Sequence, residues 1–298
     1  MGPERRLAPA TRAEIPDLDH EGRLLLSACR DAGIDAEPAV WNDPDVDWTG
    51  FDLVLIRSTW DYQNHPREFR TWTERIGTRL RNAPEIVAWN VSKRYLHVLA
   101  GWGFPVVPTE FLEPGACADG VAAALPSAGQ YVIKPAVSAG SRDTARYVAS
   151  DPEDRTRALG HASDLLGDGR TVMVQPFLHS VETEAETAVI LLGGEPAHAM
   201  RKGPLLKVGQ GLETALFREE DMSLRSARAD ELRLAQELVE RFSAEVAAPL
   251  YARVDLLRDE DGNPAVLELE VIEPSLFLDH SPSSLARLVE LLGQELDG

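Results

Sequence analysis

The chain has 298 residues, 44% of them hydrophobic and 27% charged, which is typical of a folded protein long enough for more than one domain. Its formal net charge of −19 argues against nucleic acid or an anionic membrane as a partner, because both bind basic surfaces. No apolar run reaches the roughly 18 residues of a membrane helix, and no signal peptide is evident. The two cysteines are far apart and cannot form a disulfide framework or a zinc site. We therefore expect a cytoplasmic protein.

The first 90 residues alternate between helical and strand patterns. Apolar residues recur at helical spacing between Leu18 and Ala32, and Gly33 ends that pattern. The expected elements are a helix over 18–32, strands over 36–41 and 53–57, a helix over 66–80 and a strand over 86–89. This alternation predicts a small doubly wound α/β domain over residues 1–90.

Antiparallel strands and longer helices are expected in the rest of the chain. The expected strands cover 106–109, 131–134, 146–149, 172–175, 185–192, 196–201, 252–257 and 265–271. The expected helices cover 92–101, 155–166, 229–247 and 283–296, with a short helix within 117–129. Turn residues predict hairpins across the Gly/Ser loop after Lys134 and across Asp261–Pro264. We therefore predict two α+β lobes, over residues 91–174 and 175–298.

Three carboxylates fall on the last predicted hairpin. Asp255 lies on its first strand, and Glu268 and Glu270 share one face of the second strand because side chains alternate along a strand. Such acidic groups would repel each other unless a divalent cation lay between them, and Mg²⁺ prefers carboxylates together with phosphate oxygens. The alternative is a solvent-exposed strand edge with ordinary acidic residues. Because Arg253 lies on the same hairpin, we favour a metal and nucleotide site.

Lys134 ends a predicted apolar strand and directly precedes the Gly/Ser/Ala loop 137–143. Backbone N–H groups of such a loop can contact phosphate oxygens. The Walker pattern does not fit, because it requires the lysine inside the loop. The alternative is a plain glycine hairpin, but a lysine at the end of a buried strand favours phosphate binding.

The linker after Gln175 and three further basic residues give weaker signals of nucleotide binding. The apolar strand ending at Gln175 runs into a linker whose backbone could pair with an adenine edge, although in isolation it is a strand and a turn. Lys93 opens a predicted helix, where a cation opposes the helix dipole and solvation is the simpler explanation. The pair Arg201-Lys202 ends another apolar strand.

The substrate side is predicted at the carboxyl end of strand 53–57, where doubly wound sheets bind ligands. The candidate residues there are Arg57, Ser58, Thr59 and Asp61. Trp60 and Tyr62 could equally pack a domain interface. Arg142 and Arg201 also suggest an anionic acceptor, and the loop Glu273–Ser275 could receive an amine.

Taken in order, these segments resemble the ATP-grasp superfamily over nearly the whole chain. The shared features are a lysine at a helix start, a strand lysine before a glycine loop, a hinge strand, Arg-x-Asp and Glu-x-Glu, as in D-alanine–D-alanine ligases and glutathione synthetase. Within the superfamily, the segments RSTWDY, AGSRDTAR, RKGPLL and IEPSLFL are similar to the group that contains a D-cycloserine-forming cyclo-ligase.

The resemblance implies an ATP-grasp fold and a role for each candidate residue. The ATP phosphates would be contacted by Lys93 and Lys134. The lid over them would be formed by Ser138, Ala139, Gly140 and Ser141. Adenine would be bound by Gln175, Pro176, Phe177 and Leu178, and the ribose would be bound by Glu182. Mg²⁺ or Mn²⁺ would be held by Asp255, Glu268 and Glu270. The transferred phosphoryl group would be stabilised by Arg253 and Lys202. The residues facing the substrate would be Arg57, Ser58, Thr59, Asp61, Arg142, Arg201 and Ser275. Two departures are Glu270 in place of a common Asn and Gln175 in place of a common Glu.

The resemblance further implies that ATP phosphorylates a small carboxylate and that an amine or related nucleophile attacks the acyl phosphate, releasing ADP and phosphate, in small-molecule or natural-product biosynthesis. A homodimer is possible, because dimers are the commonest assembly. The alternative is a catalytically inactive ATP-binding regulatory or scaffold protein, although such a protein has no need for three clustered carboxylates. An NAD-dependent oxidoreductase is disfavoured because no GxGxxG follows the first strand.

Overall fold

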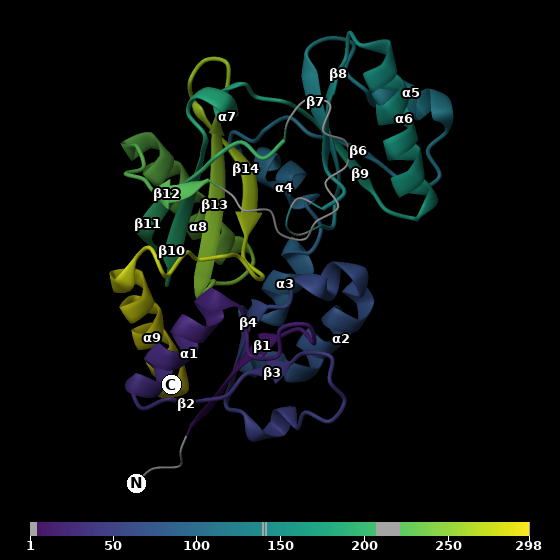
Figure 1. The fold of residues 1–298 in the computed structure, drawn as a ribbon. Coiled ribbons are helices and arrows are strands. Elements are labelled where there is room, and N and C mark those ends of the chain that lie inside the picture. The colour runs from purple at the N-terminus through teal and green to yellow at the C-terminus, as the bar shows by residue number, and fades with distance from the viewer. Residues whose placement is uncertain (1–4, 139, 141, 207–220, 298) are drawn as a thin grey trace.

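The computed structural model describes residues 5–138, 140, 142–206 and 221–297, and these residues form three β-sheets with helices packed around them (Figure 1). One sheet is parallel and belongs to the N-terminal part, and the other two are antiparallel. The expected combination of an α/β part with α+β parts is therefore confirmed. No helix in these described ranges is long and apolar enough to cross a membrane.

The N-terminal sheet has the strand order β2-β1-β4-β5, with β3 also paired to β1. Its strands are β1 Arg6–Thr11, β2 Asp35–Ala36, β3 Ala39–Val40, β4 Leu53–Ser58 and β5 Leu80–Arg81. Helices α1 His20–Asp31, α2 Pro66–Ile76 and α3 Pro84–Asn90 accompany it, with the 3₁₀ turns η1 Trp48–Gly50, η2 Trp60–Asn64 and η3 Gly77–Arg79. Every residue of β4 is buried, as expected for a parallel strand covered on both faces.

Two expectations for this region were incomplete or wrong. Strand β1 was not expected, because its segment RLAPAT is short and contains a proline. The predicted strand at 86–89 is instead part of α3, which starts at Pro84. Proline suits the first turn of a helix, and a short apolar run cannot by itself distinguish a buried strand from a helix.

The central sheet has the order β6-β9-β7-β8 and is antiparallel throughout. Its elements are α4 Tyr95–Gly101, β6 Glu110–Leu112, α5 Ala118–Ala124, β7 Gln130–Pro135, β8 Ala145–Val148, α6 Pro152–Gly167 and β9 Val172–Pro176. The hairpin expected across the glycine loop is confirmed by the pairing of β7 with β8. The expected strand at 106–109 is wrong, because within it only Val106 forms a β-bridge, to Val266.

The C-terminal sheet has the order β12-β11-β10-β13-β14 and is also antiparallel. Its elements are α7 Ser180–Thr183, β10 Glu186–Leu192, β11 Glu195–Lys202, β12 Met222–Leu224, α8 Ala229–Glu245, β13 Tyr251–Arg258, β14 Pro264–Glu270 and α9 Pro282–Asp297. The hairpin expected across Asp261–Pro264 is confirmed as β13–β14. This hairpin carries the acidic residues that the sequence analysis assigned to a metal.

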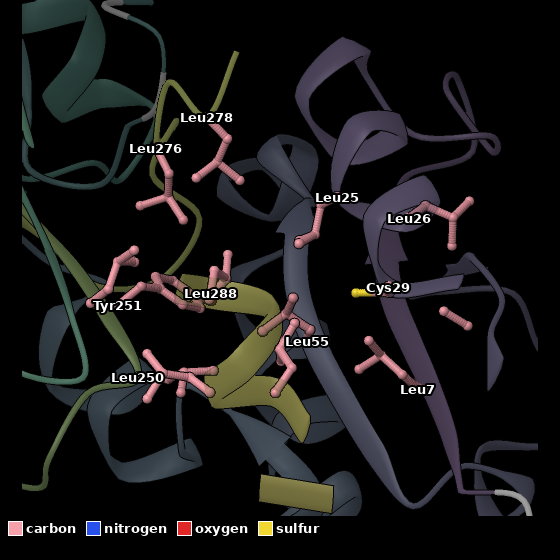
Figure 2. Packing of buried hydrophobic residues seen from close by; sticks show 14 of the residues in the cluster. Leu7, Leu25, Leu26, Cys29, Leu55, Leu250, Tyr251, Leu276, Leu278 and Leu288 are labelled. Atoms are coloured by element: carbon pink, nitrogen blue, oxygen red, sulfur yellow. The ribbon is translucent and has the colours of Figure 1, made fainter. Parts of the chain in front are cut away.

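The last helix returns to the N-terminal part of the chain, where α9 contacts α1 (Figure 1). Leu25 and Leu55 share a buried cluster with Leu250, Tyr251 and Leu288 (Figure 2). Burying such side chains together stabilises the fold by roughly 1.5–3 kcal/mol for each large aliphatic residue. The proposed domain limits at residues 90 and 174 remain predictions, and this shared core joins the first and last segments into one packed unit.

Candidate active site

A pocket of about 200 Å³ is enclosed by residues of the central and C-terminal sheets together with the segment after β11. Thirteen of the described candidate residues line it: Lys93, Lys134, Ser138, Gly140, Gln175, Pro176, Phe177, Leu178, Lys202, Arg253, Asp255, Glu268 and Glu270. The candidates Ala139 and Ser141 lie outside the described residues. The tertiary fold thus gathers most of the predicted nucleotide and metal residues, which come from both lobes, around one space.

The β13–β14 hairpin presents its acidic residues in register. Asp255 pairs with Glu268 across the two strands, and Arg253 pairs with Glu270. The Arg253 guanidinium bridges the strands, with Nε 2.8 Å from Asp255 Oδ1 and Nη2 2.6 Å from Glu270 Oε1. Its Nη1 also donates to the backbone oxygen of Ser275 at 3.2 Å. Arg253 is therefore held rigidly at the floor of the pocket.

Two lysines from the central part of the chain reach the same hairpin. Lys134 Nζ lies 2.6 Å from Glu268 Oε1, and Lys93 Nζ lies 3.7 Å from Glu268 Oε2. Lys93 also donates to the backbone oxygen of Ser138 in the glycine loop at 3.0 Å. Lys93 is therefore directed into the pocket and is not a solvated helix-start lysine.

Lys202, at the end of β11, supplies a third ammonium group. Its Nζ lies 3.0 Å from Asp255 Oδ2 and also forms an ion pair with Glu186. Glu186 opens β10 and lines the pocket, a position that the sequence analysis missed. An acidic residue at the first position of an otherwise apolar strand was the signal that could have identified it.

The ionisation of these carboxylates depends on their cations. Burial opposes ionisation of Glu268, but the ammonium groups of Lys134 and Lys93 hold its pKa below the usual value. Burial likewise opposes ionisation of Asp255, and the Arg253 guanidinium outweighs it, so this pKa is also lowered. These two carboxylates are ionised at neutral pH and are available to bind cations.

Burial dominates at three neighbouring carboxylates. It raises the pKa of Glu186 to about 8, against the attraction of Lys202. It raises the pKa of Glu270 despite the nearby guanidinium. It also raises the pKa of Glu273 to about 8, with the charge of Glu270 adding to the effect. At neutral pH the neutral form is therefore favoured at Glu186 and Glu273, in contrast to Asp255 and Glu268.

The donor chemistry of this hairpin fits Mg²⁺, which binds hard oxygen ligands. Asp255, Glu268 and Glu270 all line one pocket on adjacent strands. Within the described ranges, however, no three His, Cys, Asp or Glu side chains form a group that could hold a metal ion in the present arrangement. Each of the three carboxylates contacts a lysine or arginine instead. Metal binding here therefore requires these side chains to exchange cationic partners.

The opposite end of the pocket is formed by the strand–linker segment Gln175–Leu178 and by apolar side chains. Those apolar side chains are Val107, Val132, Val181, Leu257 and Leu267. Phe177 is fixed by its backbone N–H, which donates to Gln130 O at 2.8 Å, and by Arg146, whose guanidinium carbon lies 3.4 Å from the ring centroid. Apolar side chains beside backbone polar groups suit a nucleobase.

The structure places Glu182 away from this pocket. It lies in α7, does not line the pocket, and forms an ion pair with Arg146 at 2.7 Å with its side chain 44% exposed. Glu186 occupies the pocket wall instead. The expected ribose contact by Glu182 is therefore not supported by its position.

The candidates after β4 mostly make internal contacts. Arg57 is buried, forms an ion pair with Glu21 and donates to Pro274 O at 3.2 Å. The Ser58 hydroxyl donates to Asp19 Oδ1 at 2.7 Å. These bonds tie the N-terminal sheet to α1 and to the segment after β14, while Nε and Nη1 of Arg57 are buried without a hydrogen-bond partner among the described residues. A substrate role for Arg57 and Ser58 remains a prediction.

The remaining candidates after β4 also lie at this junction. Thr59 is buried, and Asp61 accepts a hydrogen bond from Trp41 Nε1 at 2.9 Å. Trp60 Nε1 donates to Glu273 O at 3.3 Å, so this indole contacts the segment after β14. None of these side chains is among the residues that line the pocket described above.

Arg142, Arg201 and Ser275 are dispersed. Arg142 donates to Asn64 Oδ1 at 3.3 Å, which links the glycine loop to the N-terminal part. Arg201 forms an ion pair with Asp221 at 2.8 Å. Ser275 touches the site only through its backbone oxygen, which Arg253 binds. A substrate role for these residues remains a prediction.

The chain is similar to known proteins over nearly its whole length. A family model described as the N-terminal domain of D-cycloserine synthetase DcsG matches residues 7–82. The chain is 36% identical to the cycloserine biosynthesis protein DcsG of Streptomyces lavendulae over 301 residues, covering 97% of this chain and 98% of that protein. The crystal structure of D-cycloserine synthetase DcsG matches with a TM-score of 0.86 at 35% identity, covering 98% of this chain and 99% of the other.

A more distant match concerns the fold alone. The RimK domain ATP-grasp protein from Sphaerobacter thermophilus has a TM-score of 0.67 at 17% identity, covering 98% of this chain and 100% of the other. The 36% identity along nearly the whole chain, by contrast, shows the family. The chain therefore belongs to the ATP-grasp ligases, in the family of D-cycloserine synthetase DcsG, and is an ATP-dependent ligase of natural-product biosynthesis.

Proposed function

We propose that this ligase uses Mg²⁺ and ATP to activate a small carboxylate as an acyl phosphate, and that an amine or related nucleophile then displaces phosphate. The observation that carries the proposal is the convergence of Lys93, Lys134, Lys202 and Arg253 on the carboxylates of one hairpin, beside an apolar slot. A polyphosphate needs those cations, and a bound divalent ion needs the carboxylates.

Asp255, Glu268 and Glu270 would hold the magnesium ion, which supplies charge neutralisation on the phosphate oxygens. In the present arrangement these carboxylates are paired with lysines and Arg253. On binding of magnesium and ATP, the lysines would pair with phosphate oxygens and the carboxylates with the metal. Both sets of charges would remain compensated, so the exchange avoids leaving a buried charge without a partner.

Nucleotide recognition is assigned to the opposite end of the pocket. The segment Gln175–Leu178 would contact adenine beside the Phe177 ring, which Arg146 holds in place. Glu186, rather than Glu182, would accept the ribose hydroxyl groups, because only Glu186 lines the pocket. The glycine loop would cover the phosphates and exclude water from the acyl phosphate.

The chemistry then needs little covalent participation from the protein. A substrate carboxylate oxygen attacks the γ-phosphorus, and the bond from that phosphorus to the bridging oxygen breaks as ADP leaves. The nucleophile's nitrogen next attacks the acyl carbon, the carbon–oxygen bond to phosphate breaks, and the nitrogen loses a proton. Arg253 and Lys202 would offset charge on the transferred group, so catalysis rests on positioning and electrostatics.

The substrate class follows from the relative rather than from the pocket. The curated relative is a cycloserine biosynthesis protein, so ring closure within one small amino-acid-derived molecule is the first reaction to test. Ligation of two separate molecules is the second. The loop Glu273–Ser275 beside the hairpin would receive the amine in either case.

The proposal is tested by measuring ADP and phosphate release with a panel of amino acids, amino-acid derivatives and small diacids, followed by mass spectrometry of the products. Glu268→Gln is expected to abolish magnesium-dependent ADP formation while the protein remains folded. Glu260→Gln, an exposed change in the turn of the same hairpin, is the matched control and should retain turnover. Unchanged turnover in the Glu268 variant would contradict the metal assignment. Tight ATP binding without turnover on any acid would favour the inactive scaffold alternative.

A further inference from the structure

The deep end of the nucleotide pocket contains a short relay of hydrogen bonds that starts at Gln175. Gln175 Nε2 donates to Thr109 Oγ1 at 2.8 Å, and the Thr109 hydroxyl donates to Val107 O at 2.8 Å. Val107 is itself fixed, because its backbone N–H donates to Val266 O of β14 at 2.9 Å. The relay therefore connects the linker strand β9 to the hairpin that carries the acidic residues.

The strand register explains why Thr109 meets Gln175. In the antiparallel pair β6–β9, Glu110 lies opposite Val174, so the next position outward places Thr109 opposite Gln175. Directly opposed residues have neighbouring Cβ atoms and can join side chains. The contact is thus built into the backbone and does not depend on a flexible loop.

The relay determines which way the Gln175 amide points. A hydroxyl has a single proton, and Thr109 uses it on the carbonyl of Val107, which can only accept. Thr109 must therefore accept from its other partner, and the Gln175 amide must present its NH₂ group to Thr109. This network therefore determines the orientation of the Gln175 amide.

The amide oxygen of Gln175 is left over as an acceptor. Gln175 lines the pocket and is only 3% exposed, and its Oε1 has no hydrogen-bond partner among residues 5–138, 140, 142–206 and 221–297. A ligand that displaces water from this end of the pocket must offer a donor to that oxygen, because an acceptor buried by the ligand without a partner weakens binding. The pocket therefore selects for a donor at this end.

We infer that Thr109 is a positioning residue that sets nucleobase selectivity through Gln175, an inference that rests on the proposed function. The 6-amino group of adenine is a donor and satisfies Gln175 Oε1. The 6-oxo group of guanine or hypoxanthine is an acceptor, and it cannot form a hydrogen bond with Oε1 because neither oxygen carries a proton. Without the Thr109 hydroxyl the amide is free to rotate by 180° and present its NH₂ group, which accepts the 6-oxo purine.

The test measures binding of non-hydrolysable ATP and GTP analogues by calorimetry with Mg²⁺, and the KM and kcat for ATP and GTP. The unmodified protein is expected to prefer the ATP analogue by about 100-fold or more, since the wrong base leaves a buried acceptor unpaired. Thr109→Val should reduce that preference by about tenfold, roughly the worth of one oriented hydrogen bond. The change should fall on KM and not on kcat, and Thr109→Ser should restore the preference.

Two further variants separate positioning from general damage. Thr73→Val removes another buried hydroxyl, which donates to Arg70 O at 2.8 Å in α2, and should leave the selectivity unchanged. Gln175→Glu presents oxygens in either orientation of its carboxylate, so adding Thr109→Val in that background should have no further effect on selectivity. This non-additivity is the signature of a hydroxyl that acts only by orienting the amide.

The outcomes distinguish this inference from the function on which it rests. ATP binding with an unchanged ATP-to-GTP preference in Thr109→Val would overturn the inference alone, as would a preference that Thr109→Ser does not restore. Failure of the unmodified protein to bind ATP with Mg²⁺ would overturn the proposed function and the inference with it. A reduced preference in Thr109→Val, restored in Thr109→Ser and absent in Thr73→Val, supports it.

Discussion

Lys134 and Glu268 are 134 positions apart in the chain, yet the lysine Nζ lies 2.6 Å from the carboxylate Oε1. Their side chains are only 11% and 16% exposed, so neither charge is well solvated. The pair joins the central sheet to the C-terminal hairpin at the point where the γ-phosphate and the metal are proposed to bind. In this pair Lys134 occupies the place proposed for the metal beside Glu268. Glu268 in turn occupies the place proposed for a phosphate oxygen beside Lys134.

Lys134→Met should destabilise the free protein and weaken ATP binding. Glu268 would lose its nearest cation, and breaking a buried pair from one side costs about 3–5 kcal/mol. Urea unfolding measures the loss, and calorimetry measures ATP affinity. The double variant Lys134→Met/Glu268→Gln should recover most of the unfolding free energy without recovering ATP affinity. Equal ATP affinity in Lys134→Met would show that this lysine does not contact the phosphates.

Glu186→Gln should weaken the ribose contact, whereas Glu182→Gln should have little effect. A hydrogen bond from a hydroxyl to a carboxylate contributes about 1.5–3 kcal/mol, or roughly 10- to 100-fold in affinity. The informative measurement compares KM for ATP with KM for 2′- and 3′-deoxy-ATP. Discrimination against the deoxy nucleotides should disappear in the Glu186 variant only. Its loss in the Glu182 variant instead would restore the original assignment.

The two cysteines should differ sharply in reactivity. Cys29 is fully buried in α1, and burial raises the pKa of its thiol to about 12, while Cys117 is exposed. Only the thiolate is nucleophilic, so iodoacetamide should label one site in the folded protein. Mass spectrometry after labelling should find Cys117 modified, and Cys117→Ser should remove the label. Labelling of Cys29 under native conditions would contradict the described packing of α1.

His161 should make stability depend on pH. Burial lowers its pKa below the usual value of 6.5, and its ring nitrogens contact Tyr147 Oη at 3.0 Å and Asp143 O at 3.1 Å. The charged groups facing it are Asp143, Asp164 and Arg170. Between the lowered pKa and about 6.5 the unfolded chain binds more protons than the folded one, so stability falls as pH decreases through that interval.

Urea unfolding at pH 7.5, 6.5 and 5.5 measures this dependence. His161→Gln keeps a donor and an acceptor but cannot take up a proton, so the change from pH 7.5 to 5.5 should be more favourable to its folded state than in the unmodified protein. A background dependence should remain in both proteins, because burial also lowers the pKa of His198 and, with the opposite effect on stability, raises those of Glu186 and Glu273. An identical pH dependence in the variant and the unmodified protein would show that His161 is not the titrating group.

Local sequence patterns were sufficient to predict many of the residues that line the pocket. A lysine before a glycine loop, an Arg-x-Asp strand and a Glu-x-Glu strand each needed only alternation along a strand and turn residues to be interpreted. Lys93, Lys134, Lys202 and Arg253 all line the pocket as expected. The resemblance to ATP-grasp ligases, made on those segments, is confirmed by the relative of 36% identity.

Other features could not be predicted because a short segment does not report its surroundings. The run 86–89 forms a helix because Pro84 starts one and α3 packs into the core, although its composition suits a strand. Arg57 follows a parallel strand, where ligands often bind, but its guanidinium contacts Glu21 from another element. Glu21 lies 36 positions earlier in the chain. No pattern within either segment contained that information.

The sequence by itself determined which segments carry the charged and polar groups of this ligase. These segments are the strand with Lys134 before the glycine loop, the hairpin with the three carboxylates, and the linker after Gln175. The tertiary structure decided which residues of those segments line the same pocket. A helical turn, α7, follows the linker and carries Glu182 to Arg146, so the first position of β10 brings Glu186 to the pocket instead. The physical reason is that side-chain direction depends on where the chain turns and on what each charge can pair with, and both are set by contacts between distant segments.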